Sequence, residues 1–134
     1  MKFLRFSTGD DQRLVALEAV VECIPTVQLE ESGREGSDHF RGLLHYRGRV
    51  IPVFDPGESA GEELKTEWFL VVVQLQDEEL ALVARDVHDI VECPRDQLRE
   101  VDVGSGNAMS VVSVGGEVLT VVDTERLRAT EVGQ

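Results

Sequence analysis

Two aspartates stand at matched places in this chain, Asp55 in VFDP and Asp123 in VVDT, and each follows an apolar stretch typical of a β-strand. An Asp-Thr pair at such a place in a duplicated β framework is the arrangement of aspartic proteases, in which two carboxylates share one proton. Here Glu125 replaces the glycine that follows threonine in those enzymes, and Pro56 follows Asp55. Aspartates that end strands at turns are therefore the better interpretation. A small duplicated-barrel aspartic hydrolase is the weaker alternative.

The other side chains that could act as nucleophiles or metal ligands are scattered. No histidine has a second histidine or a cysteine at a ligand spacing, and Gly104-Ser105-Gly106 lacks the residues of a phosphate or dinucleotide loop. Cys23 and Cys93 each close a Val-Glu-Cys triplet, which suggests equivalent places in two repeats and predicts reduced core residues. The sequence therefore predicts no catalytic residue, no metal site and no cofactor. The three histidines concerned are His39, His45 and His88.

Charge narrows the class of partner. The 134 residues carry a formal net charge of −13, which disfavours nucleic acid and anionic membrane surfaces because both attract basic proteins. Four arginines nevertheless crowd one region and predict a local basic island. No apolar run is long enough to span a bilayer, and the first residues turn polar too early for a secretory signal, so we expect a cytoplasmic protein. The arginines are Arg34, Arg41, Arg47 and Arg49.

An internal repeat organises the chain. GRVIPVFD (Gly48–Asp55) returns as GEVLTVVD (Gly116–Asp123), with glycine, two valines and aspartate identical at matched places. Two further segments echo one another, Phe3–Phe6 with Phe69–Val72 and Leu14–Pro25 with Leu82–Pro94, the latter with a slip of one residue. Two units of similar length predict a duplicated architecture in which the halves share apolar contacts, because neither half alone buries a sufficient core.

The elements that position these residues follow a period of two, which indicates strands. Arg47-Gly48-Arg49 predicts one hairpin turn and Gly115-Gly116 a second. Pro52 predicts an edge or a bulge in its strand because it has no amide hydrogen. Residues 94–100 predict a short helix or loop, residues 124–129 a short C-terminal helix, and residues 58–67 a link. We therefore predict an all-β protein of two small barrels, in one domain over residues 1–134 with lobes of about 15–67 and 68–122, and leave open an exchange of terminal segments between them.

Phe40–Asp55 resembles the signature of the CheW family of chemotaxis coupling proteins. The matching residues are Arg41-Gly42-Leu43-Leu44, then Arg47-Gly48, then Val50 to Asp55. Val20-Val21-Glu22, Leu82–Ile90 and Val118–Leu127 are similar to further family segments in the expected order, so the resemblance covers nearly the whole chain. Ser110 departs from the pattern, since family members often carry glycine there.

The resemblance implies two five-stranded barrel lobes and a non-enzymatic adaptor. It would join the signalling tip of methyl-accepting chemoreceptors to the regulatory domain of a CheA-type histidine kinase, and a coupling protein of a non-motility pathway such as surface sensing is the alternative. A receptor helix in the interlobe groove would bury apolar side chains and pair its carboxylates with an arginine. By motif match the receptor-binding residues are Val20, Glu22, Gly42, Arg47, Val87 and Ile90. Arg49 and Gly48 are the residues predicted to bind the kinase or another partner, and the arginines Arg47 and Arg49 are present in one lobe only.

Overall fold

The computed structural model describes residues 1–9, 11–30, 39–57, 64–104 and 107–124. Within these residues the chain forms eleven strands and two short 3₁₀ helices, η1 (Leu17–Ala19) and η2 (Arg95–Gln97). The strands are β1 (Lys2–Thr8), β2 (Asp11–Ala16), β3 (Val20–Pro25), β4 (Phe40–Tyr46), β5 (Arg49–Phe54), β6 (Phe69–Leu75), β7 (Glu78–Ala84), β8 (Asp86–Glu92), β9 (Leu98–Gly104), β10 (Asn107–Val114) and β11 (Glu117–Val121).

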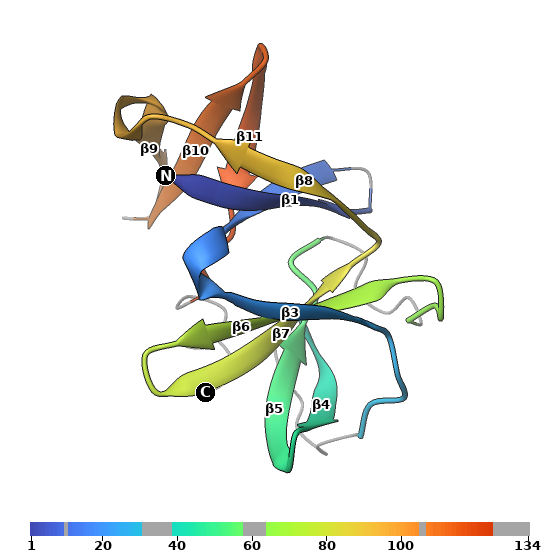
Figure 1. Ribbon diagram of the computed structural model, residues 1–134. Helices are drawn as coiled ribbons and strands as arrows, with labels where there is room; N and C mark the ends of the chain where they lie inside the picture. Colours follow the sequence, from blue (N-terminus) through green and yellow to red (C-terminus); the bar gives the residue numbers. More distant parts are fainter. Residues whose placement is uncertain (10, 31–38, 58–63, 105–106, 125–134) are drawn as a thin grey trace.

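The strands lie in two sheets, which Figure 1 shows one above the other. Sheet A has the order β8-β1-β2-β11-β10-β9, and sheet B has the order β3-β6-β7-β5-β4. Both are open sheets in the described part of the chain, so the prediction of closed five-stranded barrels is wrong in that respect. Within the described residues, no hydrogen-bonded ladder joins the two edge strands of either sheet, which are β8 and β9 in sheet A and β3 and β4 in sheet B.

Each sheet mixes the two sequence repeats. Sheet A joins the hairpin β1–β2 from the first half of the chain to β8–β11 from the second, whereas sheet B joins the hairpin β6–β7 to β3–β5. The chain crosses between the sheets through η1, and again at Arg85, which is the single residue between β7 and β8. The opening hairpins of the two repeats are therefore exchanged.

Equivalent strand pairs in the two sheets have the same register. β5 runs parallel to β7 with Val53 opposite Ala81, and β11 runs parallel to β2 with Val121 opposite Leu14. The amide of Thr26 donates to the Trp68 carbonyl over 3.0 Å, just as the amide of Cys93 donates to the Met1 carbonyl over 2.9 Å. In this register Cys93 occupies the position equivalent to Thr26, not the position equivalent to Cys23. The predicted equivalence of the two cysteines is wrong, and only Cys93 is buried while Cys23 is exposed.

Three apolar clusters form the core. One lies between the sheets and combines Leu4, Phe6 and Val15 of sheet A with residues of β5, β6 and β7 in sheet B. The other two lie on the opposite face of each sheet, around Val72 in sheet B and around Leu14 in sheet A. Strands β6 and β7 are almost continuously apolar because their successive side chains enter the shared cluster and the sheet B cluster in alternation.

Several sequence expectations differ from the structure in detail. Residues 98–104 form the strand β9, where the sequence suggested a helix or loop over residues 94–100, although η2 occupies part of that range. Pro52 is not on an edge strand, because β5 lies between β4 and β7. The hydrogen-bonded ladder between β5 and β7 starts only at Val53, one residue after Pro52. Leu43, which lies opposite Pro52 on β4, exchanges both of its backbone hydrogen bonds with Glu30. The missing amide hydrogen therefore costs no bond to β4. The predicted C-terminal helix falls almost entirely outside the described residues.

Candidate functional site

The turn between β4 and β5 presents two arginines at the tip of sheet B. Arg47 and Gly48 both adopt a positive φ, of 49° and 79°, which is the backbone of a tight two-residue hairpin turn. The turn predicted from Gly48 is confirmed. Arg47 has little steric freedom in this conformation, and 64% of its side chain is exposed. The turn therefore presents the Arg47 guanidinium at the surface.

Glu22 of β3 lies beside this turn and binds two of its side chains. The guanidinium of Arg47 is 2.9 Å from Glu22 Oε1, and the Tyr46 hydroxyl donates a hydrogen bond to the same oxygen. Arg47 also lies over the Tyr46 ring, with its central carbon 5.2 Å from the ring centroid. Burial raises the pKa of Tyr46, and the hydrogen bond to Glu22 raises it further. Two of the predicted receptor-binding residues thus bind each other.

Arg49 extends the charged cluster onto the neighbouring strands. Its guanidinium pairs with Glu79, at the start of β7. The two partners differ in exposure, since 61% of the Arg49 side chain but only 5% of the Glu79 side chain reaches solvent. Arg49 thereby compensates a buried carboxylate that would otherwise be costly.

The basic island inferred from the sequence is largely neutralised within the chain. Arg47 pairs with Glu22, Arg49 with Glu79, and Arg41 with Asp55 at 3.7 Å. The fourth arginine, Arg34, falls outside the described residues. The exposed guanidinium faces of Arg47 and Arg49 remain available for hydrogen bonding, but each carries its own counter-charge. A contact made here depends on hydrogen-bond geometry more than on net charge.

Three further predicted receptor residues lie on the edge strands β3 and β8. Val20 and Val87 are half-buried and both pack against the core cluster shared by the sheets, so the two edges border the same apolar core. Ile90, further along β8, is 57% exposed. Beside it, Arg5 of β1 holds Asp89 with two hydrogen bonds of 2.7 and 3.0 Å. The register makes Asp89 the counterpart of Glu22, so each edge strand carries an ion pair at the same position.

Gly42 lies beneath the surface rather than on it. Its φ is +137°, and a Cβ there would lie 3.0 Å from the Glu30 carbonyl oxygen and 3.2 Å from Leu29 Cβ. Glycine therefore lets residues 29 and 30 pair with the outer edge of β4 through the bridge between Glu30 and Leu43. Its counterpart Ser110 pairs with Glu100 in the full-length ladder of β9 and β10.

Tyr46 and Glu79 were missed by sequence reasoning. Tyr46 adjoins the arginine turn, but only the register shows that its hydroxyl reaches Glu22. Glu79 is far from the motif in sequence and joins it because β7 runs beside β5. Two successive glutamates at the start of a strongly apolar strand, of which Glu79 is the second, were the available signal.

The residues considered for catalysis have other roles. Asp55 is buried and accepts a hydrogen bond from the Gly57 amide over 2.9 Å, which confirms it as a strand-ending turn aspartate. Asp123 is exposed, and such unlike surroundings do not suit two carboxylates that share a proton. His39 bonds the Asp55 carbonyl, and His88 bonds the Ser7 hydroxyl. Across the described residues no cluster of three or more potential metal ligands occurs.

The comparisons decide the family. A model of the CheW-like domain matches residues 2–131. The chain belongs to the CheW family. Among solved structures, the scaffolding protein TtCheW from Thermoanaerobacter tengcongensis is similar, with a TM-score of 0.76 over 92% of this chain and 84% of that one. The two share 14% sequence identity, so this likeness concerns the fold.

Membership of the CheW family confirms the resemblance seen in the sequence and supports a chemotaxis coupling or scaffold protein. A search of curated proteins found no match. In the part of the chain that the structure describes, no helix has the length and apolar character needed to span a bilayer.

Proposed function

We propose that this CheW-family protein couples methyl-accepting chemoreceptors to a CheA-type histidine kinase in the cytoplasm, as an adaptor without a catalytic step. The observation that carries the proposal is that four of the six predicted receptor residues lie on two edge strands that border one apolar core, namely Val20, Glu22, Val87 and Ile90. Val20 of β3 and Val87 of β8 both contact that core. An amphipathic helical tip could cover both edges at once and bury its apolar face there.

The charged turn supports the same partner. Arg47 is well exposed although it is paired with Glu22, so a carboxylate of the receptor helix can bind the free side of its guanidinium. Gly42 would contribute through shape, since it allows β4 to be covered by residues 29 and 30. Arg49 and Gly48 extend the surface and are proposed to bind the kinase regulatory domain.

The test is complex formation with the cognate partners. The protein, a soluble receptor signalling fragment and the kinase regulatory domain are mixed and separated by size exclusion, and we expect a ternary peak. Absence of any complex with cognate partners overturns the proposal.

A matched pair of variants locates the receptor contact. Ile90→Asp and Val118→Asp each place a carboxylate at an exposed apolar position of sheet A, where the side chains are 57% and 64% exposed. Only Ile90 lies in the proposed site. We expect Ile90→Asp to abolish receptor binding and Val118→Asp to leave it unchanged. Equal effects would argue against this surface.

For the kinase contact, Arg49→Lys keeps a positive charge near Glu79 while it removes the planar guanidinium. We expect weaker binding of the regulatory domain and unchanged binding of the receptor fragment. Unchanged kinase affinity would contradict the role of Arg49.

A further inference from the structure

The turn that follows β5 lies between the two sheets. Asp55, Pro56 and Gly57 are all buried, although they leave a strand end where chains usually become exposed. The neighbour of Gly57 is Thr8, the last residue of β1 in sheet A, which is 3% exposed. A segment of sheet B therefore contacts the end of a sheet A strand.

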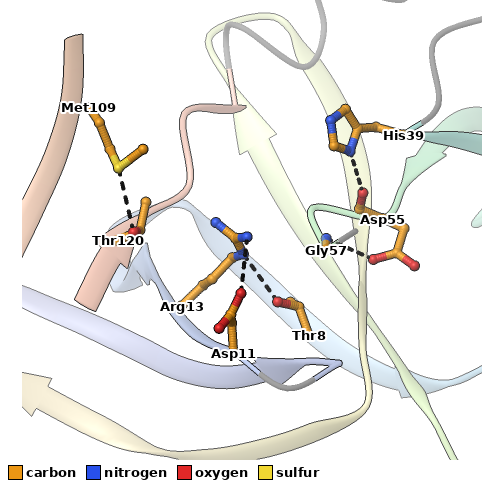
Figure 2. A network of polar contacts seen from close by, with 8 residues as sticks. All are labelled: Thr8, Asp11, Arg13, His39, Asp55, Gly57, Met109 and Thr120. Carbon is orange, nitrogen blue, oxygen red and sulfur yellow. Dashed lines mark hydrogen bonds and ion pairs between the residues drawn. The ribbon is translucent and has the colours of Figure 1, made fainter. Parts of the chain in front are cut away.

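Polar contacts fix this turn within sheet B. The Gly57 amide donates to Asp55 Oδ1 over 2.9 Å, and Asp55 Oδ2 lies 3.7 Å from Arg41 Nη1. The Asp55 amide donates to the His39 carbonyl over 2.7 Å, and the His39 ring is 2.9 Å from the Asp55 carbonyl oxygen. Figure 2 shows His39, Asp55 and Gly57 as one group, facing Thr8.

The approach to sheet A depends on glycine. A Cβ at Gly57 would lie 3.1 Å from both Thr8 Cβ and the Thr8 carbonyl oxygen. Gly57 does not adopt a positive φ, so close approach, not backbone conformation, requires glycine here. Thr8 is itself held, because Arg13 Nε donates to its hydroxyl over 3.0 Å, as Figure 2 shows.

Directional contacts between the sheets gather at this end of β1. The amide of Arg85, at the crossing from β7 to β8, donates to the Ser7 carbonyl over 2.8 Å. The sheets also share the apolar cluster, and apolar contact favours burial without specifying an angle. The hydrogen bond at Ser7 and the close packing of Gly57 on Thr8 can therefore set the angle between the sheets.

We propose that Asp55–Gly57 clamps the two sheets and sets the relative position of the edge strands β3 and β8. Asp55, Gly57 and Thr8 are positioning residues for partner binding, although they touch no partner. This rests on the proposed function in so far as the partner spans both edges. In the second repeat Asp123, the counterpart of Asp55, is exposed.

The test measures the sheet-to-sheet distance and the receptor affinity in Gly57→Ala. Spin labels are attached to the exposed native Cys23 on β3 and to a cysteine replacing the exposed Glu92 on β8, while Cys93 is buried. We expect the alanine variant to shift or broaden the measured distance distribution and to weaken binding of the receptor fragment about tenfold. Binding is measured well below the melting temperature.

Val112→Ala is the control for stability. Val112 is fully buried in the sheet A cluster, which contains none of the clamp residues, so the substitution should lower the melting temperature without changing the distance. If Gly57→Ala folds and keeps both the wild-type distance distribution and affinity, the clamp is overturned. Because the distance is measured without any partner, failure of the proposed function would leave this readout intact.

If Gly57→Ala does not fold, a second pair of variants, at Thr8, tests the clamp. Thr8→Ala and Thr8→Gly both lose the hydroxyl that Arg13 binds, but only glycine removes the Cβ against which Gly57 lies. We expect Thr8→Gly alone to broaden the distance distribution. An unchanged distribution in Thr8→Gly contradicts the clamp.

Discussion

The side chains of the arginine turn act in pairs. Arg47 and Arg49 are both more than half exposed, yet each has a carboxylate partner within the chain. The sequence predicted the turn, because a glycine such as Gly48 readily adopts the positive φ of a tight turn, and it predicted the strand-ending role of Asp55. It could not predict the pairings, because Glu22 and Glu79 reach the turn only through strand neighbours that are remote in sequence. Because both arginines are already paired, we expect the turn to bind a partner through hydrogen-bond geometry more than through net charge.

Arg47→Glu should weaken receptor binding at least tenfold without unfolding the protein. The new carboxylate would face Glu22 and repel receptor carboxylates, whereas loss of an exposed ion pair costs only about 0.5–1 kcal/mol of stability. Affinity by calorimetry and the far-ultraviolet circular dichroism spectrum check both statements.

The control for Arg47→Glu is the double variant Glu22→Arg/Arg47→Glu, which restores an internal pair with reversed orientation. Receptor binding that returns to the wild-type level would show that the pair serves folding and not contact.

Tyr46→Phe should reduce the alkaline loss of stability. The Tyr46 pKa is raised in the folded protein, so below the ordinary value of 10.0 both states keep the proton and no dependence arises. Above that value the unfolded state releases the proton first, and stability falls as pH rises through the folded pKa. Denaturant unfolding from about pH 9 to about pH 11 checks this.

Tyr46 is the only tyrosine, so its phenolate absorbance reports the folded pKa directly. Identical alkaline profiles for the wild type and Tyr46→Phe would rule out this contribution.

Among the elements, hairpins and apolar strands were predictable and β9 was not. The hairpins have glycine turns, and β6 is a nearly unbroken apolar run. β9 follows a proline and carries charged residues at Arg99, Glu100 and Asp102, so its period is obscured. Its place as a strand comes from pairing with β10. In the described part of sheet B, the bridge between Glu30 and Leu43 lies at the matching position.

Gly42→Ala should destabilise the protein by about 1–3 kcal/mol, because it adds backbone strain and a clash with the segment that covers β4. The control Gly116→Ala also has a positive φ, of 88°, but no atom lies within 4 Å of the added carbon. We expect a smaller loss there, of about 1 kcal/mol. Urea unfolding of both variants gives the difference. Equal losses would show that residues 29 and 30 tolerate the methyl group.

At the scale of the molecule, the repeat predicted duplication but not the way its parts combine. A sequence match shows that two segments are alike, and it does not say which sheet each joins. The exchange of the hairpins β1–β2 and β6–β7 follows from the crossings at η1 and Arg85. The slip seen between Leu14–Pro25 and Leu82–Pro94 also misled the alignment of the cysteines, which only the backbone register corrects.

Phe6→Ala should destabilise both sheets together, by about 3–5 kcal/mol. Phe6 belongs to sheet A but is fully buried in the cluster that the sheets share. Trp68, the only tryptophan, reports on the sheet B cluster. We expect the unfolding midpoint by Trp68 fluorescence to fall with that by circular dichroism. A fluorescence midpoint that stays at the wild-type value would show that the sheets unfold separately.

The exchanged hairpins make the covalent link over residues 58–67 dispensable for holding the halves together. A cut there leaves one piece that carries β1–β5 and another that carries β6–β11, and each still inserts a hairpin into the sheet of the other. Four strand pairings span the cut, namely β1 with β8, β2 with β11, β3 with β6 and β5 with β7. Each piece thus completes a sheet of the other, and we expect the two pieces to stay associated through these strand pairings without the covalent link.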